Sequence, residues 1–160
     1  MNSVLQKHIV KKYHIFFDYL KEDKSDIMLP IYFGFECDDG WFNLLDTLMG
    51  QIKHYCEWKK IEPIRITQIK EKFGTLCFYY ENGDTYINGM VSMTTQMSSK
   101  TCEVCGTMNN VGRTSGGWVK YMCQDCHSKS QRLSDLKWTP NSTERILKIA
   151  KLFNGKRNNT

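Results

Sequence analysis

The sequence contains no run of apolar residues approaching the roughly 18–20 that a membrane-spanning helix requires, and no internal repeat or low-complexity segment. It also contains no phosphate-binding loop, dinucleotide-binding fingerprint, H-E-x-x-H motif or nucleophile elbow. Its first residues have no apolar block of the kind found in secretory leaders. We therefore expect a cytosolic protein that does not belong to the common enzyme classes that these motifs mark.

The composition is that of a folded domain with an unusual number of cysteines. The 160 residues are 41% apolar and 24% charged, which argues against a disordered, collagenous or coiled-coil chain. A chain of this length usually forms one domain and buries about 68–70% of its unfolded surface. The chain has seven cysteines. In a reducing compartment, clustered cysteines hold metal more often than they form disulfides.

Hydrophobic periodicity predicts an α+β fold. Its expected elements are helices over about residues 4–21, 40–57 and 84–99, and a β-hairpin over about 63–81. Ser3 and Gln6 form a capping-box pattern at the start of the first helix. We expect Asp38 or Asp39 to cap the second helix and Asp84 to cap the third.

Four of the cysteines have the spacing of a metal site. Cys102 and Cys105 form one C-x2-C pair, and Cys123 and Cys126 form a second pair 17 residues later. This is the spacing of a structural, tetrahedral zinc site, and Gly106 permits the turn that follows the first pair. Four sulfur ligands would leave no open position for catalysis, so we expect a structural Zn²⁺ ion. A redox-active dithiol is the main alternative.

The segments around the cysteines predict the order of a treble-clef finger. Residues 118–122 alternate like a strand, and the second cysteine pair opens into a helix-like segment. The spacing resembles that of GATA-type DNA-binding fingers. His127 completes the C-x-x-C-H pattern of haem attachment, but that reading would leave Cys102 and Cys105 unused. We divide the chain into a body (1–99), a zinc finger (100–137) and a basic amphipathic helix with a tail (138–160).

The basic residues are concentrated near the C-terminus. Residues 129–160 contain eight basic and two acidic side chains, whereas the preceding 128 residues contain 14 basic and 15 acidic ones. Four thiolates around a divalent cation would make the finger itself net negative, which weakens a DNA-binding interpretation of the finger. Candidate nucleic-acid contacts are therefore confined to the last segment: Arg145, Lys148, Lys151, Lys156 and Arg157. The alternative is a solvated basic tail.

The hairpin region supplies candidate residues for an anionic, aromatic ligand. Cations alternate with aromatic side chains there, and one further arginine lies in the finger: Arg65, Lys70, Lys72, Phe73, Tyr79, Tyr80 and Arg113. The alternative is a set of solvated charges beside core aromatics. Cys37, Cys56 and Cys77 remain, and we interpret them as buried structural thiols, because no histidine is paired with them in the sequence.

Three blocks together resemble a family of small tailed-bacteriophage proteins. They are D-G-W-F-N-L-L at 39–45, Q-I-K-E-K-F-G-T-L-C-F-Y at 68–79, and T-C-E-V-C-G at 101–106 followed by the second cysteine pair. Cys77 stands where the family typically has arginine. The resemblance implies zinc binding and an early or accessory phage role, such as host takeover or counter-defence, in the cytoplasm of an infected bacterium.

These observations predict a non-enzymatic protein with structural zinc. It would bind a host macromolecule or sequester a phosphate-bearing signal nucleotide. Sequence-tolerant binding of DNA or RNA through the finger and tail is the second hypothesis, and an enzyme with an unrecognised site is the third.

Overall fold

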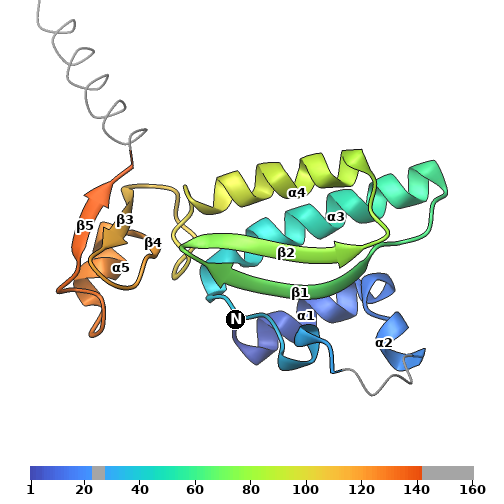
Figure 1. The fold of residues 1–160 in the computed structure, drawn as a ribbon, viewed down its shortest axis with the longest axis horizontal. Coiled ribbons are helices and arrows are strands. Elements are labelled where there is room, and N and C mark those ends of the chain that lie inside the picture. The colour runs from blue at the N-terminus through green and yellow to red at the C-terminus, as the bar shows by residue number, and fades with distance from the viewer. Residues whose placement is uncertain (23–27, 142–160) are drawn as a thin grey trace, which may run out of the picture.

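The computed structural model describes residues 1–22 and 28–141, and the predicted α+β class is confirmed. Within these residues the body contains seven helical segments and a hairpin: α1 (Ser3–Lys12), η1 (His14–Phe16), α2 (Tyr19–Glu22), η2 (Pro30–Phe33), η3 (Asp39–Trp41), α3 (Phe42–Lys59), β1 (Arg65–Lys72), β2 (Thr75–Glu81) and α4 (Thr85–Ser98). The finger contains β3 (Val111–Ser115), β4 (Tyr121–Cys123), α5 (Gln124–Lys129) and β5 (Lys137–Pro140). Figure 1 shows the finger at the turn end of the β1–β2 hairpin.

The single helix predicted over residues 4–21 is wrong, because the structure divides this stretch into α1, η1 and α2. The break lies at Tyr13, whose φ of −118° and ψ of 35° leave the helical region. The Tyr13 side chain is only 3% exposed, and its hydroxyl donates to the main-chain oxygen of Asp46 at 2.7 Å. Burial of this ring and its bond to α3 therefore override the helical periodicity of the sequence.

The predicted capping box at Ser3 and Gln6 is also wrong by one residue. Asn2 caps α1, because its side-chain oxygen accepts hydrogen bonds from the backbone N–H groups of Val4 and Leu5, both at 3.0 Å. The Gln6 side-chain oxygen instead accepts from the backbone N–H of Phe35 at 3.1 Å. Gln6 thus ties α1 to the segment before η3.

The second helix begins differently from the prediction. Residues 39–41 form the short helix η3, and Asp38 at its start makes no side-chain capping bond. The Asp39 carboxylate accepts from the backbone and side-chain nitrogens of Asn2, each at 2.7 Å. Helix α3 follows directly and ends where Lys60 adopts a left-handed conformation. Both aspartates therefore serve tertiary contacts and do not cap α3.

The hairpin and the third helix agree with the prediction. Strands β1 and β2 are antiparallel, and their turn has positive φ at Phe73 and Gly74 (53° and 86°), as a two-residue hairpin turn requires. The Asp84 side chain accepts from the first two backbone N–H groups past the start of α4, at 3.0 and 2.9 Å. Helices α3 and α4 run side by side along the hairpin (Figure 1).

The finger has its own sheet, in the order β4-β3-β5. Strand β5 pairs with β3 from Ser115↔Lys137 to Gly112↔Pro140, so the predicted boundary at 137/138 falls inside a strand. The basic helix predicted for the last segment lies outside the described residues. Within the described ranges, no helix is long and apolar enough to cross a membrane.

Candidate functional site

The four predicted metal ligands come together in the finger. The Sγ atoms of Cys102, Cys105, Cys123 and Cys126 all lie within 4.8 Å of one another. The Cys105 and Cys123 sulfurs are 3.8 Å apart. A tetrahedron of sulfurs at about 2.3 Å from a central zinc has edges of about 3.8 Å, so this separation suits a thiolate-bound ion. The cluster can therefore hold a metal ion.

A tight turn aims the first pair of cysteines at one point. The Gly106 N–H donates to the Cys102 carbonyl at 2.8 Å, and the Cys102 N–H donates to the Thr107 carbonyl at 2.8 Å. Gly106 has a φ of 78°, where a side chain would be strained. These bonds bring the Cys105 thiol back over Cys102, as the C-x2-C spacing predicts.

The start of α5 positions the second pair. Cys123 is the last residue of β4 and the N-cap of α5, and its sulfur accepts from the Cys126 N–H at 3.4 Å. Cys102 and Cys123 are buried, Cys126 is half-buried and Cys105 is exposed. Burial raises the pKa of the thiols of Cys102 and Cys126. A bound cation would favour the thiolate forms of Cys102 and Cys126 against this effect of burial.

The first cysteine turn packs directly on the body through main-chain atoms. The Gly40 N–H donates to the Glu103 carbonyl at 2.8 Å. A Cβ atom at Gly40 would lie 2.3 Å from the Cys102 carbonyl oxygen and 2.5 Å from both the Glu103 oxygen and the Gly106 nitrogen. The buried Trp41 indole also donates to the Thr101 carbonyl at 3.4 Å. Only a glycine at position 40 permits this approach.

An ion cluster around the buried Glu103 joins the finger to the body beside this contact. The Glu103 carboxylate is 2% exposed, and one of its oxygens accepts from the Asp38 N–H at 3.1 Å. Lys120 Nζ lies 2.5 Å from an Asp38 carboxylate oxygen and 3.3 Å from the second Glu103 oxygen. Burial raises the pKa of Glu103, and Lys120 only partly offsets this. Burial lowers the pKa of Lys120, but its two acidic partners outweigh burial and leave that pKa raised.

The hairpin turn completes the junction between body and finger. A Cβ atom on Gly74 would lie 2.9 Å from the ring of Tyr121 and 3.3 Å from Val119. The contacts at Gly40, at Glu103 and at Gly74 belong to the three sequence blocks that carry the family resemblance. In the fold these blocks meet at one place.

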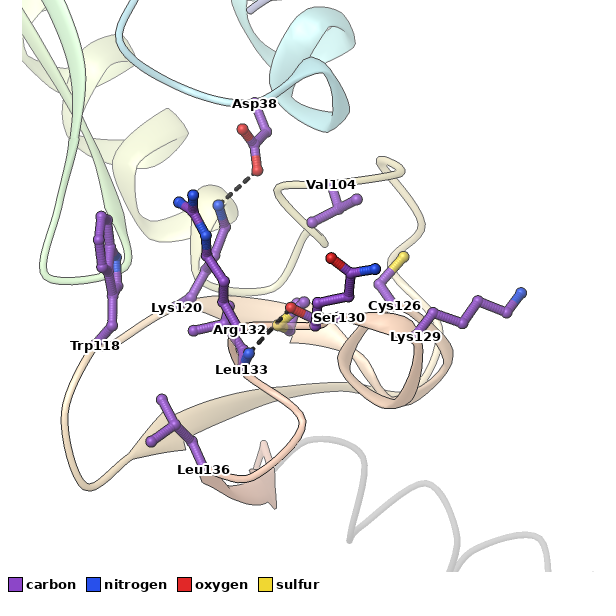
Figure 2. Close-up of a pocket in the computed structure, with 12 residues that line it drawn as sticks. Asp38, Val104, Trp118, Lys120, Cys126, Lys129, Ser130, Arg132, Leu133 and Leu136 are labelled. Atoms are coloured by element: carbon purple, nitrogen blue, oxygen red, sulfur yellow. Dashed lines mark hydrogen bonds and ion pairs between the residues drawn. The ribbon is translucent and has the colours of Figure 1, made fainter.

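A cavity of about 840 Å³ opens next to this junction and next to the candidate metal ligand Cys126. We call it the junction cavity. Its apolar wall includes Trp118, Leu133 and Leu136, and its charged residues are Asp38, Lys120, Lys129 and Arg132. Figure 2 shows that the side chains of Lys120 and Arg132 extend toward the side where Asp38 lies. The residues of this cavity come from segments separated by up to 98 positions, so no local pattern in the sequence indicates it.

Trp118 lies on a loop that lines the cavity. The predicted strand over 118–122 is shorter, since β4 covers only Tyr121–Cys123. The buried Thr114 hydroxyl donates to the Trp118 carbonyl at 2.7 Å and accepts from the Lys120 N–H at 2.8 Å. These bonds fix the backbone outside the β4 ladder, while the Trp118 side chain stays 63% exposed. The pair of glycines just before Trp118 is the sequence signal for this loop.

The hairpin candidates form two cation–aromatic pairs. Lys70 Nζ lies 5.4 Å from the ring centre of Tyr79, and Lys72 Nζ lies 5.7 Å from that of Phe73. Phe73 is 75% exposed at the turn. The structure therefore places Lys70, Lys72 and Tyr79 on the face of the hairpin opposite its buried side, with Phe73 at the turn.

The remaining candidates lie elsewhere. Arg65 begins β1 and sits over the ring of Tyr19 at 5.7 Å, and seven residue steps of about 3.3 Å place it about 23 Å along the strand from Lys72. Tyr80 is half-buried, and its ring centre lies 5.9 Å from that of Phe78. Arg113 lies in β3 of the finger and lines a separate cavity of about 290 Å³.

The three cysteines outside the cluster differ in burial. Cys37 and Cys56 are buried, and burial raises the pKa of Cys37 to about 12 and also raises that of Cys56. These two are the inert core thiols that we predicted. Cys77 is only half-buried, in β2 opposite Lys70. His127, the histidine of the C-x-x-C-H pattern, is buried 3.0 Å from the Leu136 carbonyl oxygen.

The five basic candidates of the last segment lie outside the described residues: Arg145, Lys148, Lys151, Lys156 and Arg157. Comparisons with protein-family models, with curated proteins and with solved structures find no match. The resemblance to the phage family therefore stays a prediction.

Proposed function

We propose that Cys102, Cys105, Cys123 and Cys126 bind one structural Zn²⁺ ion, and that the chain is a non-enzymatic binding protein. The observation that carries this proposal is the set of four sulfurs within 4.8 Å of one another. Thiolates select soft or borderline ions, and a four-sulfur set at tetrahedral spacing is typical of zinc. With four protein ligands the ion has no position for a reactive water. The metal would then stabilise the fold and take no part in catalysis.

The contacts of the metal site support a role in building a binding surface. The first cysteine turn is fixed to the body at Gly40, and the second pair fixes the start of α5. The segment after α5 forms one wall of the junction cavity. Zinc would thus hold the finger residues that line the cavity in place beside Asp38 of the body. A host macromolecule or a phosphate-bearing nucleotide is the partner that we propose, and the phage accessory role rests on the sequence resemblance.

A pair of cysteine variants tests the zinc proposal. Cys105→Ser removes the exposed ligand, whereas Cys77→Ser changes a half-buried thiol outside the cluster. We expect Cys105→Ser to lose bound zinc and to melt at a lower temperature, because structural zinc affinity is largely folding free energy. Cys77→Ser should keep one zinc per chain. Equal zinc content in the two variants would contradict the proposal.

The binding role is tested on the purified protein itself. Denaturing protein taken from its expression host should release a bound small molecule or a tightly bound macromolecule that mass spectrometry can identify. Turnover of a released molecule by fresh protein would contradict the non-enzymatic role.

A further inference from the structure

We propose that the junction cavity binds a nucleotide, with the base stacked on Trp118 and a phosphate held by Arg132. This inference rests on the proposed binding function and names its ligand class and its site. A volume of about 840 Å³ lies within the range of sites for small organic ligands. The cavity is also distinct from the hairpin surface that the sequence predicted for such a ligand.

Trp118 supplies an exposed aromatic side chain at the cavity. The Trp118 indole is 63% exposed, so burial of the ring does not hold this loop in place. Here the backbone on both sides of Val119 is fixed by the buried Thr114 hydroxyl, which bonds to the Trp118 carbonyl and to the Lys120 N–H. The loop therefore presents an aromatic face at the cavity while leaving it open. Such faces bind nucleic-acid bases by stacking, with little dependence on base identity.

The basic side chains that line the cavity differ in their partners. Lys120 is held by Asp38 and Glu103, so it provides no free positive charge. Arg132 lines the same cavity and is exposed. Within residues 1–22 and 28–141 it forms no ion pair. A guanidinium binds phosphate through two parallel hydrogen bonds, so an unpaired arginine beside an aromatic face suits a nucleotide.

Three aliphatic side chains form part of the cavity wall. Leu133 and Leu136 are half-buried on the segment after α5, and Val104 is 40% exposed on the cysteine turn. They flank the space into which Figure 2 shows Arg132 extending. A free inorganic anion could bind Arg132 but would gain nothing from these apolar side chains. An uncharged aromatic ring could pack on the apolar side chains but would gain nothing from the charge of Arg132. The ligand that satisfies both has a planar ring and a phosphate.

The same chemistry can come from a free nucleotide or from single-stranded nucleic acid, so the test uses both. Zinc-loaded, full-length protein is titrated calorimetrically with AMP, GMP, adenosine, inorganic phosphate and a 12-nucleotide single strand. We expect a nucleotide or the single strand to bind, and we expect adenosine and phosphate each to bind at least tenfold more weakly than whichever of these binds most tightly. Binding of the single strand alone, lost in the Trp118 variant, would identify nucleic acid as the source.

Matched variants locate the site. Trp118→Ala and Arg132→Ala should each weaken binding at least tenfold. Trp58→Ala removes an indole that is 69% exposed on α3, and Lys72→Ala removes an exposed cation at the hairpin, and neither should change the affinity. Zinc content equal to that of the unmodified protein shows that each variant is folded.

Two results overturn the inference while leaving the zinc proposal intact. One is zinc-loaded protein that binds none of the probes at millimolar concentration. The other is binding that survives both cavity substitutions but is lost in Lys72→Ala, which would place the site on the hairpin. Loss of zinc from the unmodified protein would instead contradict the proposed function itself.

Discussion

Replacing Gly40 by alanine tests whether the finger is fixed to the body through the cysteine turn. The added Cβ would lie 2.3 Å from the Cys102 carbonyl oxygen and 2.5 Å from two further main-chain atoms. All three are backbone atoms of the metal-binding turn, so no flexible side chain can move to relieve the clash. Gly40 does not have positive φ, so alanine is not strained by backbone conformation. The clash is then the only direct effect of the change.

Forced insertion of a methyl group into packed structure costs about 1–3 kcal/mol. In a domain of about 150–250 residues, each kcal/mol lowers the melting temperature by about 2–4 °C. We therefore expect Gly40→Ala to melt about 2–12 °C lower in circular dichroism and to release zinc faster to a chelator, because the turn is displaced from the body.

Gly89 provides the matched control. It lies inside α4, and a Cβ there would meet no atom within 4 Å. Gly89→Ala should therefore raise stability by about 0.5–1 kcal/mol, since glycine is unfavourable in a helix interior. If Gly40→Ala also kept or raised the melting temperature and released zinc at the rate of the unmodified protein, the proposed junction would be refuted.

Three further predictions concern the rest of the chain. Hydrogen bonds from the start of α4 lower the pKa of Asp84, so its stabilising effect is present above the unfolded pKa of about 3.9 and is lost as pH falls through the folded value. The melting-temperature gap between the unmodified protein and Asp84→Ala should narrow below about pH 4, and a gap that stays constant to pH 2 would contradict this. Tyr13→Phe keeps the ring but removes the hydroxyl bonds to Asp46, and should cost about 1 kcal/mol in urea denaturation; unchanged stability would show that ring burial alone breaks the helix. Deleting residues 142–160 retains Asn141, which bonds to the body, and should abolish any duplex-DNA affinity and its salt dependence. DNA binding that survives this deletion would show that the finger itself contacts nucleic acid.

Local patterns predicted the parts of the fold that depend on local chemistry. The Asp84 cap, the hairpin turn and the spacing of the four cysteines each involve residues a few positions apart, and the structure confirms each of them. The break at Tyr13 could not be predicted in this way, because it depends on a bond to Asp46, 33 positions away. The cap is Asn2 and not Ser3 for the same reason, since the Gln6 side chain accepts a hydrogen bond from the distant Phe35 N–H and does not complete a capping box with Ser3.

The junction between finger and body could not be predicted from the sequence for the same reason, because its contacts join residues that are far apart in the chain. The sequence around Gly40 indicates a turn before a helix. Nothing near Gly40 in the sequence indicates that it contacts a cysteine turn that begins 62 positions later. From its place between two cysteines, Glu103 would be expected at the surface. In the structure it is buried, because Lys120 pairs with its charge and the Asp38 N–H donates a hydrogen bond to it. Local sequence therefore predicts a ligand site at the hairpin, where basic and aromatic residues are close in sequence.

The central claim is that four cysteine sulfurs hold a zinc ion that joins the finger to the body. Elemental analysis combined with X-ray absorption at the zinc edge, on protein purified without added metal, tests it most directly. We predict one zinc per chain with four sulfur neighbours at about 2.3 Å. Protein that is folded without metal, or zinc bound by oxygen or nitrogen in place of any of the four sulfurs, would contradict the claim.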